Sequence, residues 1–237
     1  MMLAARRRRW LHDGEEFVRG RIWSLEDATI QTLAELFIDS RGRMQNSLNE
    51  VFERTATSGQ WTAGDIAFRQ RTEYLLSQID NEIVRLMAGA QDATLRAATL
   101  GYQGGFYGRA WMLNQGLRTD QLINLPVLPT EAIRAAILAP YRGLTFIDRF
   151  ADARDDFVRR IRRAIVQSQI EGDTIYQAQK RLADALGINI GRRTRAARLA
   201  NRGLFNRTEM IARTEILRSS NLGAMQIYLE KDRKSVV

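Results

Sequence analysis

Arginine is the most abundant residue type in this chain whose side chain could bind a ligand. The 237 residues include 36 Lys and Arg, and lysine stands only at positions 180, 231 and 234, so 36 − 3 = 33 are arginines. The net charge is +9. Guanidinium groups bind phosphate in a bidentate manner, so this balance favours a polyanion such as nucleic acid as a neighbour. A GC-rich genome, which raises Arg and Ala together, is the alternative explanation.

Two groups of arginines are spaced to contact phosphates. Neither group has regularly interleaved aromatic residues, so any DNA contact should be non-specific and directed to the backbone. A solvated charged surface is the alternative for each group. The first group is an arm near the start of the chain and the second is a later run: Arg6, Arg7, Arg8 and Arg9, then Arg192, Arg193, Arg195, Arg198 and Arg202.

Catalytic and metal-binding residue sets are missing from the sequence. The chain has no cysteine, and its one histidine, His12, lies beside the arginine run in no sequence context that would order it for catalysis. No Walker, HExxH or zinc-binding pattern occurs. No run of 18 apolar residues occurs, and no apolar stretch follows the first arginines, so the sequence predicts neither a membrane span nor a signal peptide. We therefore expect no enzyme activity, no cofactor, no metal and no membrane partner.

A repeated Arg-Thr-Glu at 207–209 and 213–215 is the most informative motif. On a helical wheel, Thr214, Arg218 and Asn221 fall within one apolar arc. Buried polar groups need hydrogen-bond partners, so we expect these three to face inward, against helices at 156–169 or 174–186. Two explanations of this motif are open: a polar cluster that fixes helix pairing, and a family signature. The apolar arc comprises Met210, Ile211, Leu217, Leu222, Met225, Tyr228 and Leu229.

The elements that must position these residues are nearly all helical. A capping-box variant at 24–27 predicts the start of a long helix that ends near 58–59. Residues 62–65 predict the start of a second helix, and we expect an Ala-rich third helix after it. Strand signals are nearly absent apart from 235–237. The fold class expected is mainly α: an elongated helical bundle with long N-terminal helices, a second helical C-terminal half, and the start of a strand at its end.

Glycines in the Ala-rich helix recur four residues apart beside aromatic residues. Such spacing lets a second helix approach closely, and Tyr, Phe and Trp are favoured anchors at protein interfaces. We expect the face to be covered by a helix of this chain or of a partner protein. Ordinary core packing is the alternative for each aromatic residue. The interface residues are Gly101, Tyr102, Gly105, Phe106 and Trp111.

The three prolines of the chain cluster between 119 and 145 and suggest the domain boundary. We expect an N-terminal region at 1–118, a linker at 119–145 that contains a short helix at about 130–139, and a helical domain at 146–237. Within the last, 155–169 is two-faced, with apolar residues on one side and four arginines on the other. A turn at 172–174 then caps the next helix.

From about Tyr141 onward, the order of elements resembles the tailed-phage minor head proteins, also called head morphogenesis proteins. About 90 residues are covered: a Gly143-Leu-Thr-Phe-Ile-Asp148-Arg149 entry, an amphipathic helix, the Gly172-Asp-Thr174 turn, a helix ending in Leu-Gly, and the Ala212-Arg213-Thr214-Glu215 motif. In the family, a segment with strands follows, so we expect the natural product to extend past Val237. The signature residues are Arg213, Thr214, Glu215, Arg218, Asn221 and Gly223.

The resemblance implies a structural virion protein without enzyme activity. Its expected partners are the portal protein, phage DNA bound without sequence preference, and a scaffold or major capsid protein. Its expected location is the head interior or portal vertex of the virion, and the host cytoplasm during assembly. It would influence assembly, packaging or ejection of DNA. A stand-alone non-specific DNA-binding protein is the alternative, and an enzyme that lacks its catalytic half is a third.

Overall fold

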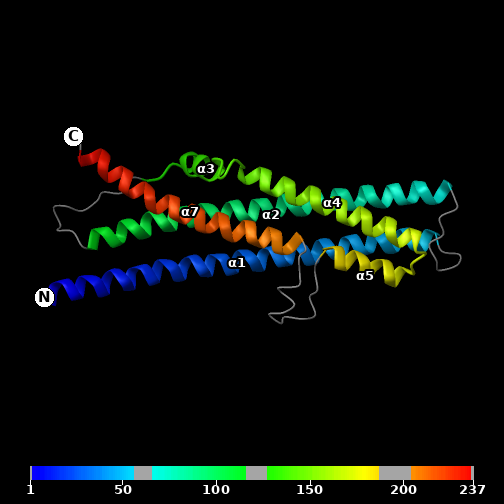
Figure 1. The fold of residues 1–237 in the computed structure, drawn as a ribbon, viewed down its shortest axis with the longest axis horizontal. Helices are drawn as coiled ribbons and strands as arrows, with labels where there is room; N and C mark the ends of the chain where they lie inside the picture. The colour runs from blue at the N-terminus through cyan, green and yellow to red at the C-terminus, as the bar shows by residue number, and fades with distance from the viewer. Residues whose placement is uncertain (1, 56–65, 116–126, 187–203, 236–237) are drawn as a thin grey trace. The chain divides into compact units, whose positions relative to one another are not determined.

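A computed structural model of the chain describes residues 2–55, 66–115, 127–186 and 204–235, and six helices account for nearly all of them. No strand occurs in these ranges, although Tyr141 and Leu144 form an isolated antiparallel bridge. The mainly α, helical-bundle class predicted from the sequence is therefore confirmed. The helices are α1 (Met2–Thr55), α2 (Ile66–Gln115), α3 (Thr130–Leu138), α4 (Phe146–Ile170), α5 (Ile175–Leu186) and α7 (Leu204–Ser235) (Figure 1).

The chain forms two compact units, and each is assembled from separated segments. Unit 1 contains Met1–Gln31, Asp92–Ile147 and Ile211–Val237, and unit 2 contains Thr32–Gln91 and Asp148–Met210. The helices α1, α2 and α7 each contribute residues to both units. This division differs from the sequence-ordered regions 1–118, 119–145 and 146–237, because contacts between distant segments define the units.

The two long N-terminal helices differ from their expected limits. Ser24 does not cap a helix, because α1 already runs through it and its hydroxyl donates to the carbonyl of Gly20 one turn earlier (3.0 Å). The expected second and third helices are one continuous helix, α2. Helix starts at caps are only a local preference, and packing along the whole length overrides it here.

The C-terminal half agrees more closely with the sequence. The short helix expected at 130–139 is α3. Thr174 caps α5 in a reciprocal box: its backbone N–H donates to Gln177 Oε1 (2.7 Å), and the Gln177 N–H donates to Thr174 Oγ1 (3.4 Å). Gly172 takes the positive φ of +66° that this turn requires.

The prediction of a strand at 235–237 is wrong at its first residue, Ser235. Ser235 belongs to α7, which continues through the charged 230–234 stretch. Lys, Glu and Arg are good helix formers, and this explains why the helix persists there. Val236 and Val237 lie outside the described residues.

Large apolar side chains form the core of unit 2. Phe37 on α1 meets Phe205 on α7 edge to face, with ring centroids 5.3 Å apart. The amphipathic character of α4 is confirmed, because Phe157 and Ile161 are buried on one face. The arginines of the opposite face of α4 are exposed. Other buried members of this core are Leu33, Met44, Leu48, Leu75, Ile79, Ile83, Phe150 and Ile165.

Candidate functional site

Helices α2 and α7 approach each other in unit 1 through small residues. A Cβ atom built on Gly105 would overlap the backbone of Ser220, and one built on Gly223 would overlap the carbonyl oxygen of Tyr102. A Cβ on Gly101 would lie 3.0 Å from the carbonyl oxygen of Ile216. Glycine at these positions therefore permits backbone-to-backbone contact that any larger residue would prevent.

The glycine face expected to bind a partner is thus covered by α7 of the same chain. Gly101 and Gly105 are buried against it, and Tyr102 and Phe106 are buried in the adjoining core. These four residues are not available to another protein. They pack within the chain, as the alternative expectation had it. Trp111 is different, because its side chain is 46% exposed.

The Arg-Thr-Glu helix turns a different face inward from the one expected. Thr214 and Asn221 are exposed, and so are most of the large residues of the predicted arc. Small residues recur in the buried stripe, and they allow α7 to lie close to α2. The stripe includes Ala212, Glu215, Ile216, Ser219, Ser220, Gly223 and Ile227.

Of the three polar residues predicted to face inward, Arg218 does so, and it joins α7 to the end of α3. Its Nη1 donates to the carbonyl of Ile137 (3.1 Å) and to Glu215 Oε2 (3.0 Å), and its Nη2 donates to the carbonyl of Ala139 (2.8 Å). The guanidinium also lies 5.3 Å from the ring centroid of Tyr141. A cation at the carbonyls that end a helix is favourable. Glu215, which is fully buried, thereby has its charge partner.

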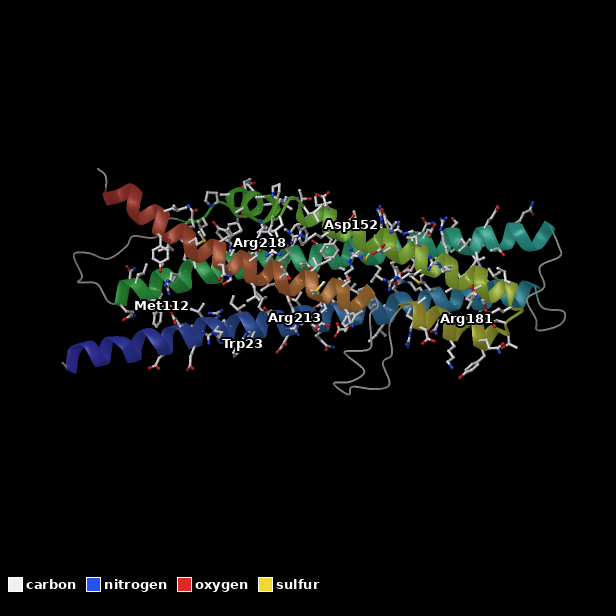
Figure 2. The ribbon with its side chains drawn as sticks, in the orientation of Figure 1. Trp23, Met112, Asp152, Arg181, Arg213 and Arg218 are labelled. Atoms are coloured by element: carbon white, nitrogen blue, oxygen red, sulfur yellow. The ribbon has the colours of Figure 1, made fainter. Side chains whose placement is uncertain are left out.

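Arg213 joins α7 to α1. Its Nη1 donates to Glu26 Oε2 at 3.2 Å, and Glu26 is 5% exposed. Burial raises the pKa of Glu26 above its ordinary value, although the charge and hydrogen bond of Arg213 oppose this. Figure 2 shows Arg213 beside α1 and Arg218 toward α3. The two arginines therefore hold α7 to two different helices of unit 1.

A groove lies between α1 and α2 in unit 1. Its volume is about 370 Å³. Phe17 and Leu100 on its walls are more than half exposed. Gly104 opens the floor, since a Cβ there would meet only Ile22 Cδ1, at 3.8 Å. The lining residues are Phe17, Val18, Arg21, Ile22, Leu25, Leu100, Gln103, Gly104, Tyr107 and Gly108.

Aromatic and basic groups border this groove. The rings of Phe17 and Trp111 have centroids 6.5 Å apart, so Trp111 extends the apolar surface. The Arg21 guanidinium lies 6.0 Å from the Phe17 ring centroid, and in the described part of the chain Arg21 has no carboxylate partner. The groove can therefore take an apolar segment that carries a carboxylate. The sequence reasoning missed Phe17 and Leu100, although the neighbouring Gly104 and Gly108 were a signal.

The arginines expected to bind DNA lie largely outside the described structure. Arg6–Arg9 are within α1, but nothing is described of their side chains, and the 192–202 run is outside the described residues. On α4, Arg159 and Arg162 are exposed and pair with Asp156 and Asp80. That pairing reduces the positive charge that this face of α4 presents.

Three further observations bear on function. In the described ranges, no group of three or more His, Cys, Asp and Glu residues could hold a metal ion. Among the helices described, none is long and apolar enough to cross a membrane. Comparison with protein-family models, with curated proteins and with solved structures finds no match.

Proposed function

We propose that this chain is a structural minor capsid protein of a tailed phage, which binds the portal vertex and contacts DNA without sequence preference. The resemblance of the C-terminal elements to head morphogenesis proteins supports the class of protein. The observation that carries the binding role is the apolar groove lined by Phe17, Leu100 and Tyr107. Grooves of exposed aromatic residues bordered by polar groups are typical of protein-binding surfaces.

The portal protein is the partner that we assign to this groove. Gly104 leaves space at the floor of the groove, and Arg21 on its wall has no carboxylate partner among the described residues, so an apolar portal segment with a carboxylate fits it. Trp111 adds a further exposed ring at one side. Large aromatic residues and arginine are the side chains that contribute most binding energy at interfaces.

Co-purification of the full chain with its portal protein tests this role. Leu100→Ser should weaken portal binding at least about tenfold, because it removes an apolar wall of the groove. Val84→Ser is the matched control, since Val84 is on the same helix and similarly exposed (53% against 55%). The control should bind as the wild type does. Equal binding by all three chains, or no binding by the wild type, would contradict the assignment.

The stand-alone DNA-binding alternative is favoured by one observation, the net charge of +9. Replacing Arg6–Arg9 by Ala should lower the salt dependence of DNA affinity by up to about 4 units of log–log slope if all four contact phosphate. A chain that binds DNA with the expected slope but never binds portal would favour this alternative over the proposed one.

A further inference from the structure

Helix α7 leaves a regular stripe of side chains exposed in unit 1. The stripe contains Thr214, Leu217, Asn221, Met225 and Tyr228, all of which are on the outer face of the helix. The spacings are three, four, four and three residues, so the side chains form one seam about 21 Å long at about 1.5 Å per residue. Seams with this spacing pack against another helix in coiled-coil-like pairs.

The seam is symmetric about its centre. Asn221 is the midpoint of Leu217 and Met225 and also of Thr214 and Tyr228. If a second copy of α7 lies antiparallel across a two-fold axis at Asn221, Leu217 faces Met225 of the other copy and Thr214 faces Tyr228. Each large side chain then meets a smaller or more flexible one, and the contact is the same from both sides.

The chemistry of the seam also suits a second copy. None of its five side chains is charged, so two molecules of charge +9 can meet here without placing like charges opposite each other. Beside the seam, Arg218 directs its guanidinium to the carbonyls at the end of α3. The Tyr228 hydroxyl accepts a hydrogen bond from Arg109 Nε (2.6 Å), and its ring is 42% exposed.

Asn221 can fix the register of a pair of α7 helices. It is exposed, and its amide has no hydrogen-bond partner in the part of the chain that the structure describes. An amide carries both donors and an acceptor, so two Asn221 side chains across the axis satisfy each other. A single asparagine at the centre of an apolar seam is a known determinant of helix register.

We propose that two copies of this chain associate through an antiparallel pairing of their α7 helices centred on Asn221. The inference is independent of the groove between α1 and α2 that we assign to the portal. Few side chains contribute to the seam, so the dimer is expected at the weak end of specific interfaces, with a Kd on the order of micromolar. Dimer and monomer should therefore exchange with protein concentration.

Sedimentation equilibrium of the full chain over about 1–100 µM tests the association. Leu217→Glu should raise the dimer Kd more than about tenfold, since it places a carboxylate in the apolar contact. Val84→Glu is the matched control, because Val84 on α2 has similar exposure (53% against 47% for Leu217) and lies outside both the seam and the groove, and it should leave the dimer unchanged. A monomer throughout the range, or equal loss in both variants, would overturn the proposal.

Cysteine cross-linking tests the orientation, and the chain has no native cysteine to confuse it. Mixed Leu217→Cys and Met225→Cys chains should form disulfide-linked heterodimers, and each variant alone should form few. Asn221→Cys alone should cross-link readily. Cross-linking of each variant with itself at 217 and 225 would indicate a parallel pair and overturn the antiparallel geometry. A monomeric chain whose Leu217→Glu variant loses portal binding would instead assign the seam to the portal.

Discussion

The two units of this protein use different means to bring helices together. Unit 1 joins α2 and α7 through glycines whose missing Cβ atoms let the backbones touch. Unit 2 relies on large buried side chains such as Phe37 and Phe157. Interdigitated large side chains lose stability when atoms are removed, whereas close backbone contact loses it when atoms are added. The α2–α7 contact of unit 1 and the large-residue core of unit 2 should therefore respond oppositely to changes in side-chain size.

The acids of the two units differ as well. Glu26 in unit 1 is buried, and burial raises its pKa. Asp156 in unit 2 accepts hydrogen bonds from Arg159 and Arg207, and these bonds lower its pKa. A buried acid and an acid at the surface thus couple the stability of the protein to pH with opposite signs.

The largest effect is expected from Arg218→Met in unit 1. This change leaves Glu215 as a buried carboxylate without its charge partner, and it also removes the donors to Ile137 and Ala139. Breaking a buried ion pair in this way costs about 3–5 kcal/mol. Chemical denaturation measures the loss. Arg163→Met, on the exposed face of α4, should change the free energy of unfolding by less than about 0.5 kcal/mol.

The next effect is expected from Gly223→Ala. The added methyl would overlap the carbonyl oxygen of Tyr102, which is backbone and cannot turn away. Overpacking of this kind costs about 3 kcal/mol. Gly20→Ala is the control in the same unit, because a Cβ there meets nothing within 4 Å. The control should gain about 0.5–1 kcal/mol from helix propensity. Similar stabilities for the two variants would refute the close-contact interpretation.

A smaller effect is expected at Glu26. A raised carboxyl pKa in the folded state means that folding favours the protonated form, so stability rises as the pH falls through the folded pKa toward 4.5. Glu26→Gln should lack this rise and should be at least as stable as the wild type at pH 7. Denaturation curves from pH 7 to 4.5 compare the two chains. A parallel pH dependence would show that Glu26 does not titrate as described.

The smallest effect is expected at Asp156 in unit 2, which forms surface ion pairs with Arg159 and Arg207. The lowered pKa of Asp156 contributes stability above pH 3.8, which is lost as the pH falls through its folded pKa. Asp156→Asn should be slightly less stable than the wild type at pH 7 and should lose less on acidification below 3.8. Because the group is at the surface, added salt should reduce the difference. A difference that is unchanged in high salt would contradict the surface pairing.

Much of the local structure could be predicted from the sequence, but the buried face of α7 could not. The Thr174 cap, α3 and the two faces of α4 each follow from a short pattern that the structure confirms. The helical wheel grouped the large apolar residues of α7 in one arc, but it assumed that they face inward, and most of them are exposed. Close approach to α2 instead required the small residues Ser219, Ser220 and Gly223, and long-range packing of this kind leaves no short pattern.

The candidate site was predictable only in part. The glycines at 101 and 105 correctly indicated a close helix contact, but a sequence cannot state which helix supplies the other side. Arg213 was singled out as a signature residue, but its partner Glu26 lies 187 residues away in the chain. The groove residues Phe17 and Leu100 come from separate helices, so no local motif unites them.

The discontinuous composition of unit 1 sets an order of events during synthesis. Glu26 is made early, and its partner Arg213 appears 187 residues later. At about 5–20 residues per second, translation leaves a delay of roughly ten to forty seconds between them. Gly101 and Gly105 each precede their contacts on α7, Ile216 and Ser220, by 115 residues. For roughly six to twenty-three seconds of that delay, the glycine face of α2 therefore has no α7 to cover it. The nascent chain therefore presents an uncovered apolar helix to the ribosome surface and to chaperones until α7 emerges.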